Sequence, residues 1–169
     1  MSIARQFLKP LAWTLAVTAL YAGIALAIAM SGGSSQAATT ERIVTDRNTG
    51  LALFGFDPVA YFTENAPRPG AREHELSWGG VTWRFANEGN LQAFRADPGV
   101  YGPRFGGYDP VAVAQGLPTG GHPSIWAVHE DRLYVFHSEA NRMTFAGNAR
   151  AILTHADQAW PKVRADLVP

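Results

Sequence analysis

Apolar residues first gather in one uninterrupted segment near the start of the chain and are then spread over short stretches. No charged residue occurs from Leu11 to Met30, and the basic residues Arg5 and Lys9 precede this segment. A helix of that length spans roughly 30 Å, the thickness of the hydrocarbon core of a bilayer. Basic residues before the segment, with none shortly after it, predict that the chain starts inside and continues outside.

The same segment is compatible with a cleaved signal peptide, because Ser35-Gln36-Ala37 offers small residues for a cut before Ala38. Signal cores usually run about 7 to 15 residues, so the greater length favours an uncleaved anchor. Cleavage leaves the domain periplasmic or secreted, whereas an uncleaved anchor holds it on the periplasmic side of the cytoplasmic membrane. The predicted divisions are an anchor or signal peptide at 1–37, a linker at 38–50 and a domain at 51–165.

Beyond the linker, the pattern of apolar positions predicts short strands. "VTWRF" (81–85) and "LYVF" (133–136) are typical of strands. The segment 125–136 predicts a hairpin that turns at Glu130-Asp131 and has apolar residues on both faces. Such a hairpin should lie inside a sheet or under helices.

Helices are expected at about 88–96, at about 139–152, and at about 147–160, where Pro161 should end the last one. Strands and helices together predict the α+β class and one compact domain. The predicted helix caps are Asp57, Asn87, Asp109 and Ser138, because their side chains accept hydrogen bonds from the first N–H groups of a helix.

Two phrases recur along the chain. "GFDPVAYF" starts at Gly55 and "GYDPVAVA" at Gly107, while "FANEGNLQAF" starts at Phe85 and "FHSEANRMTF" at Phe136. Two pairs of segments at nearly the same offset indicate a tandem duplication of about 50 residues. The predicted repeats cover about 55–101 and about 107–154.

Composition excludes several kinds of function. The 14 Lys and Arg residues balance 14 Asp and Glu residues, so no basic face for nucleic acid is expected. Cysteine is absent, which removes disulfides and thiolate chemistry. No nucleophile elbow, phosphate-binding loop or dinucleotide fingerprint occurs. Asp57 and Asp109 could form a pair of acid–base catalysts. Helix capping explains both aspartates more simply. We therefore expect a protein that is not an enzyme.

These motifs resemble the YHS domain. "DPVA" followed by "GGVTWRFANEGNLQAFRADPGVY" (79–101) is similar to its pattern, and Phe136-His137-Ser138 is similar to the Tyr-His-Ser of its name. The resemblance to exported bacterial YHS-domain proteins covers roughly 51–162. Metal-associated members of the family have cysteines at positions that here hold Ala60, Ala86 and Asn90, and exported members often have one at Asp109. This chain is therefore a divergent member by resemblance, and the family's thiolate metal role does not transfer to it.

Histidines and aromatic residues supply the remaining candidates. In the predicted register His137 lies opposite Ser124 with His122 as its diagonal neighbour, so His122, His137 and Asp109 form a candidate Cu or Zn site. No resident cofactor is otherwise expected. Phe105, Tyr108 and Trp126 form a candidate ligand or partner surface.

Two functions follow from these observations. The first is an accessory subunit or docking module of an inner-membrane protein complex, tethered by residues 11–30. The second is a free periplasmic protein that binds a small ligand or a metal ion.

Overall fold

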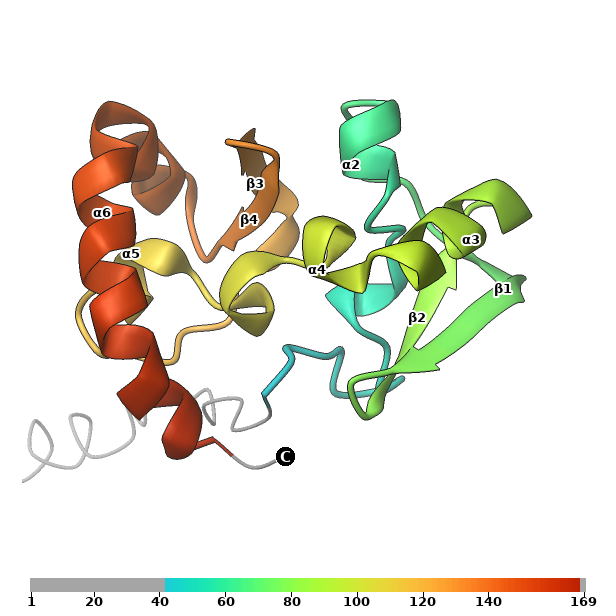
Figure 1. Ribbon diagram of the computed structural model, residues 1–169, viewed down its shortest axis with the longest axis horizontal. Coiled ribbons are helices and arrows are strands. Elements are labelled where there is room, and N and C mark those ends of the chain that lie inside the picture. Colours follow the sequence, from blue (N-terminus) through green and yellow to red (C-terminus); the bar gives the residue numbers. More distant parts are fainter. Residues whose placement is uncertain (1–41, 168–169) are drawn as a thin grey trace, which may run out of the picture. The chain divides into compact units, whose positions relative to one another are not determined.

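A computed structural model describes residues 42–167 of the chain (Figure 1). The predicted anchor at 11–30 and the cleavage site near Ala37 lie outside the described residues. Within residues 42–167, no helix combines the length and apolar character needed to cross a membrane. The predicted α+β class is confirmed, because this part of the chain folds into two antiparallel hairpins with helices around them.

The first half of the described chain carries one hairpin. Its elements are η1 (Leu53–Gly55), α2 (Ala60–Thr63), β1 (Ala71–Trp78), β2 (Val81–Phe85), α3 (Glu88–Ala96) and α4 (Pro98–Tyr101). Helix α3 has the predicted bounds: the Asn87 side chain accepts the N–H of Asn90 at its start, and Asp97-Pro98 ends it. Leu91 and Phe94 form its buried face.

The second half carries the other hairpin and the longest helix. Its elements are η2 (Arg104–Gly107), α5 (Pro110–Val113), β3 (His122–His129), β4 (Arg132–Phe136) and α6 (Glu139–Ala165). The predicted turn at Glu130-Asp131 is confirmed, and both residues adopt positive φ angles of 48° and 53°. This conformation is typical of a two-residue hairpin turn.

The predicted end of the last helix before Pro161 is wrong, because α6 continues to Ala165. Only Asn148, with φ −155° and ψ 51°, departs from helical geometry inside it. Trp160 and Leu167 pack against one hydrophobic core on either side of the proline. This burial keeps the last turn helical, although Pro161 cannot donate a backbone hydrogen bond.

The two hairpins have the same register, 51 residues apart. Trp78 pairs with Val81 and His129 with Arg132 next to the turns, while Ala71 pairs with Phe85 and His122 with Phe136 at the far ends. In both hairpins a register shift separates the far pair from the others. The two hairpins therefore share the same strand pairing and the same position of the register shift.

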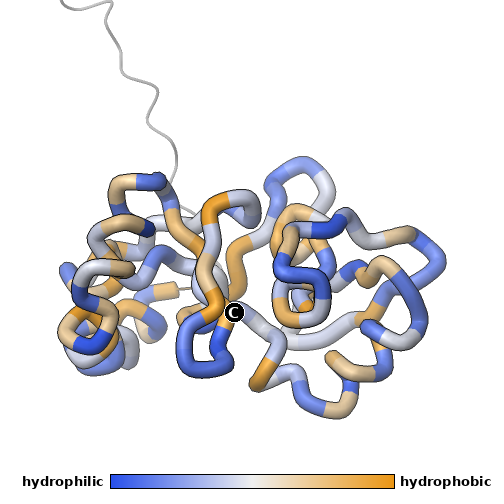
Figure 2. The backbone as a smooth tube through the Cα atoms, turned by 90° about the horizontal axis from the view of Figure 1, so that it is seen from above, coloured by the Kyte–Doolittle hydropathy of each residue, from blue (hydrophilic) through white to orange (hydrophobic). Residues whose placement is uncertain are grey.

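The second hairpin separates two hydrophobic cores. Leu133 and Val135 pack into the core formed with Trp83, Phe85 and other residues of the first half. The alternate residues of β4, Tyr134 and Phe136, pack into a second core with residues of η2, α5 and α6. In Figure 2 hydrophilic stretches occur along the helices, where they alternate with hydrophobic ones, as well as in the loops. The expectation that both faces of this hairpin are covered is confirmed.

Candidate functional site

Asp57 is a fully buried carboxylate that accepts hydrogen bonds from four N–H donors. Oδ1 accepts the backbone N–H groups of Val59 and Ala60, at 2.8 and 3.3 Å. Oδ2 accepts the backbone N–H of Ala86, at 2.8 Å, and the Asn90 side-chain amide, at 2.6 Å. The carboxylate thus caps the turn that leads into α2 and joins it to the start of α3.

Asp109 has the corresponding set of bonds in the second half. Oδ1 accepts the N–H groups of Val111 and Ala112, at 2.8 and 3.4 Å. Oδ2 accepts the N–H of His137, at 2.8 Å, and the Asn141 amide, at 2.7 Å. Asp109 is also fully buried. Because every donor has its counterpart in the first half, both aspartates serve as internal caps, at the positions that the sequence indicates.

The histidines and Asp109 are not assembled into a metal site. In residues 42–167, no group of three or more His, Cys, Asp or Glu side chains is placed to hold a metal ion. The expected pairing of His137 with Ser124 is wrong, because His122 instead pairs with Phe136 across the register shift. Sequence alternation cannot reveal such a shift. The oxygens of Asp109 face four N–H groups, a setting for a cap and not for a ligand.

Each of the two imidazoles contacts nearby backbone. His122 Nδ1 accepts the N–H of Ser124 at 3.2 Å, and its ring lies 5.6 Å from the ring of Phe54. His137 Nδ1 lies 3.3 Å from the carbonyl oxygen of Gly120. Their local contacts are those of side chains at the end of a hairpin.

Of the three aromatic candidates, one lines a groove. Tyr108 is fully buried, so it is not part of an exposed surface. Trp126 packs edge-to-face on Tyr61 at 5.1 Å, beside the first core. Phe105 is nearly buried, but its side chain forms part of a groove wall.

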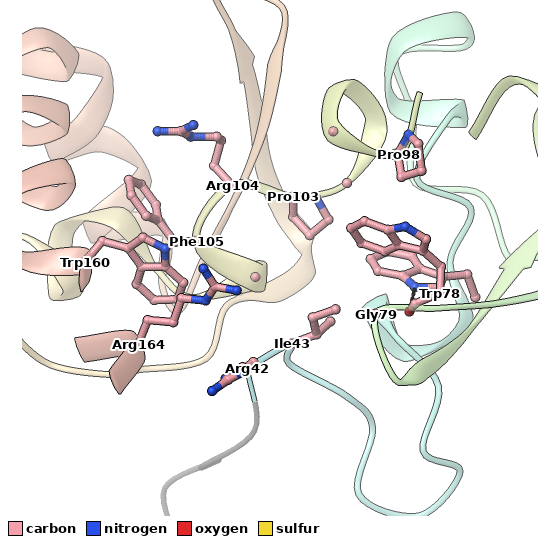
Figure 3. Close-up of a pocket in the computed structure, with 14 residues that line it drawn as sticks. Arg42, Ile43, Trp78, Gly79, Pro98, Pro103, Arg104, Phe105, Trp160 and Arg164 are labelled. Atoms are coloured by element: carbon pink, nitrogen blue, oxygen red, sulfur yellow. Dashed lines mark hydrogen bonds between the residues drawn. The ribbon is translucent and has the colours of Figure 1, made fainter. Parts of the chain in front are cut away.

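This groove has a volume of about 500 Å³ and combines aromatic with guanidinium side chains (Figure 3). Trp160 and Arg164 enter it from α6 on one side, Trp78 lines the opposite side from β1, and Ile43 lies between them. We call it the arginine groove. Its other aromatic and cationic lining residues are Trp83, Phe105, Arg42 and Arg104.

Glycines let the start of the described chain lie along the arginine groove. A Cβ atom on Gly106, whose φ is 63°, would overlap the carbonyl oxygen of Arg42. Gly106 also accepts the N–H of Val44 through its own carbonyl, at 2.8 Å. A Cβ atom on Gly79 would lie 2.7 Å from Ile43 Cδ1. Residues 42–44 are therefore held directly against the groove.

The charge of the arginine groove is positive. Its lining includes three arginines and no Asp or Glu. Arg104 donates to Asp157 at 2.6 Å and lies over the Phe105 ring at 5.2 Å. Neither Arg42 nor Arg164 forms an ion pair with another residue of 42–167. Two guanidinium groups are thus left to attract an anion.

Of the residues that line this groove, the sequence indicates only Phe105 as a candidate. The arginines of the groove come from the start of the domain, from η2 and from the end of α6, so no motif links them. Comparison of the chain with protein-family models, with curated proteins and with solved structures finds no match.

Proposed function

We propose that this chain is an exported, membrane-tethered, non-catalytic YHS-like domain that acts as an accessory subunit or docking module of a membrane protein complex. One observation carries the proposal: the arginine groove lies where the described chain begins, at Arg42. Only eleven residues, 31–41, separate Arg42 from Met30, the end of the predicted anchor. A binding groove that is so near to the predicted tether along the chain favours a partner in or on the same membrane.

The surroundings of Asp57 support the YHS-like part of the proposal. The resemblance assigns family cysteines to the positions of Ala60, Ala86 and Asn90, which are far apart in the sequence. Two backbone N–H groups and one side chain from these positions meet on the single carboxylate of Asp57. A functional cluster of the family would bring the same three positions together. In this chain the hydrogen bonds of Asp57 occupy the place of that cluster.

The network around Asp109 supports a tandem duplication. Ala112, His137 and Asn141 supply its donors, and they lie 51 or 52 residues after the donors of Asp57. Four matched hydrogen bonds, together with two hairpins in one register, are the expected result of one ancestral unit copied once.

The same networks favour a non-catalytic role. An acid–base catalyst needs a carboxyl oxygen that can reach a substrate. Both oxygens of Asp57 and of Asp109 are instead buried and bonded to the protein's own N–H groups.

The volume of the arginine groove favours a second candidate, a free periplasmic protein that binds a small anionic ligand. Small-molecule sites usually measure about 300–1,000 Å³, a range that includes this groove. In this alternative the segment before Ala38 is removed. A metal-ion function is not proposed, because the described residues assemble no ligand set.

A native mass spectrum of the untagged protein, extracted gently from its own membranes, tests the two candidates. We expect a mass that starts at Met1 and travels with other polypeptides. A mass that starts at Ala38, with no associated chain, would refute the accessory role and favour the free ligand-binding protein. A small molecule retained on that shorter chain would identify its ligand.

A further inference from the structure

The arginine groove combines two features that an amphipathic anion requires. Arg42 and Arg164 are exposed and have no ion pair within residues 42–167, so they can bind a phosphate. One guanidinium group can donate two parallel hydrogen bonds to two phosphate oxygens, which favours arginine over lysine for phosphate binding. Trp78 is 41% exposed and lies across the groove from Arg164 (Figure 3).

Tryptophan is characteristic of the membrane–water interface, because its ring is apolar and its N–H is polar. Trp78 and Trp160 occupy opposite sides of the groove, and Ile43 lies between them. An occupant therefore meets apolar surface as well as charge. A purely ionic ligand would leave the indole rings in contact with water.

The predicted tether restricts where the groove can go. Eleven residues separate Met30 from Arg42, and a chain of that length reaches at most roughly 40 Å when fully extended. Because residues 42–44 are held along the groove by the Val44–Gly106 hydrogen bond, this distance applies to the groove itself. The proposed tether would therefore keep the groove within this reach of the membrane surface.

We infer that the arginine groove binds the headgroup of an anionic phospholipid in the membrane that holds residues 11–30. This inference rests on the tether of the proposed function. Arg42 and Arg164 hold the phosphate, and Trp78 and Trp160 contact the glycerol and the upper acyl chains. Arg104, neutralised by Asp157, supports the wall through its contact with Phe105. Lipid binding fixes the domain on the bilayer surface in one orientation.

The test uses the full chain mixed with two kinds of vesicle, phosphatidylcholine alone or an equal mixture of phosphatidylcholine and phosphatidylglycerol. Each contains a trace of lipid with a nitroxide on its headgroup, which quenches indole fluorescence on contact. All variants also carry Trp13→Phe, because Trp13 lies in the predicted anchor and would be quenched there. Quenching then reports on the tryptophans of the domain.

We expect stronger quenching in vesicles with phosphatidylglycerol, and its loss in the Arg42→Gln/Arg164→Gln variant. Two basic residues at a charged membrane surface correspond to roughly a 30-fold change in affinity. The matched control is Arg95→Gln/Arg150→Gln, which removes two exposed arginines outside the groove. This control should keep the quenching of the parent chain.

Resistance of the chain to alkaline extraction from the vesicles reports separately on the tether. A chain that stays inserted, with equal quenching in both lipids, overturns the lipid inference and leaves the tether standing. A chain that is extracted, yet binds phosphatidylglycerol vesicles through Arg42 and Arg164, supports the lipid inference and refutes the tether. A chain that does neither overturns both.

Discussion

The β1–β2 and β3–β4 hairpins share one register but differ in what covers their second face. In the first hairpin Glu75 pairs with Arg84, and their side chains form a partly exposed ion pair of 2.8 Å. At the corresponding positions of the second hairpin, Trp126 pairs with Val135, and Val135 is buried. The same backbone unit thus has a polar outer face in one half and an apolar one in the other.

This difference decides which hairpin occupies the centre. Burying the outer face of β3–β4 inserts Leu133 and Val135 into the core of the first half. Tyr61 strengthens this contact, because its hydroxyl donates to the carbonyl oxygen of Pro123 at 2.9 Å. Two related units can therefore pack as one domain when only one of them gives up its polar face.

The largest expected effect comes from reversing that face. Val135→Arg places a guanidinium group without a partner in the first core and should cost more than about 4 kcal/mol, enough to unfold a marginal domain. The matched change in the other hairpin, Arg84→Val, should cost less than about 1 kcal/mol, because it removes only a partly exposed ion pair. Urea unfolding of the detergent-solubilised chain, followed by near-UV circular dichroism, measures both. Similar losses for the two variants would contradict the proposed difference between the hairpins.

The buried aspartates test the opposite point, that the halves are alike. Asp57→Asn and Asp109→Asn each present an amide NH₂ to groups that donate hydrogen bonds, so each should cost about 3 kcal/mol. The same urea experiment compares them. A loss of stability in only one of the two variants would show that the matched hydrogen bonds contribute unequally to the free energy of unfolding.

The turns should respond in opposite directions. Glu130 and Asp131 adopt positive φ angles in the second turn. In the first turn the two residues with positive φ angles are glycines, Gly79 and Gly80. The double change Glu130→Asn/Asp131→Gly should stabilise the chain by about 1–2 kcal/mol, because Asn-Gly suits this turn. Gly80→Ala is the reverse control: its Cβ meets nothing within 4 Å, so its destabilisation reports backbone strain alone. Thermal unfolding compares the two, and a destabilising Asn-Gly turn would exclude strain at 130–131.

Tyr61→Phe should have the smallest effect at neutral pH, about 1 kcal/mol for the lost hydrogen bond to Pro123. Burial, and then the charge of Asp57, hold the pKa of Tyr61 above its ordinary value of 10.0. The folded state therefore keeps the proton when the unfolded chain loses it, and stability falls as pH rises above about 10.

Above a pH of about 10, each tyrosine that stays protonated only in the folded state lowers the free energy of unfolding by about 1.4 kcal/mol per pH unit. Tyr61→Phe should remove the contribution of one tyrosine from this slope. Burial also raises the pKa of Tyr134, so some slope should remain in the variant. Urea midpoints between pH 8 and 11 measure it. An unchanged slope would mean that Tyr61 ionises in the folded state.

The sequence by itself determined the local units. The α+β class, the turn at Glu130-Asp131, the bounds of α3 and the apolar faces of β4 all follow from patterns between neighbouring residues, and the structure agrees with each. These features depend on periodicity, turn geometry and capping, which act over a few residues and leave their mark in the sequence.

Only the tertiary structure decided which distant residues meet. The register shift in β3 separates His137 from Ser124, packing carries α6 past Pro161, and the fold gathers Arg42, Arg104 and Arg164 in one groove. No local pattern encodes these outcomes. Burial of apolar surface between separate segments is non-directional, so the final positions depend on how the whole domain packs.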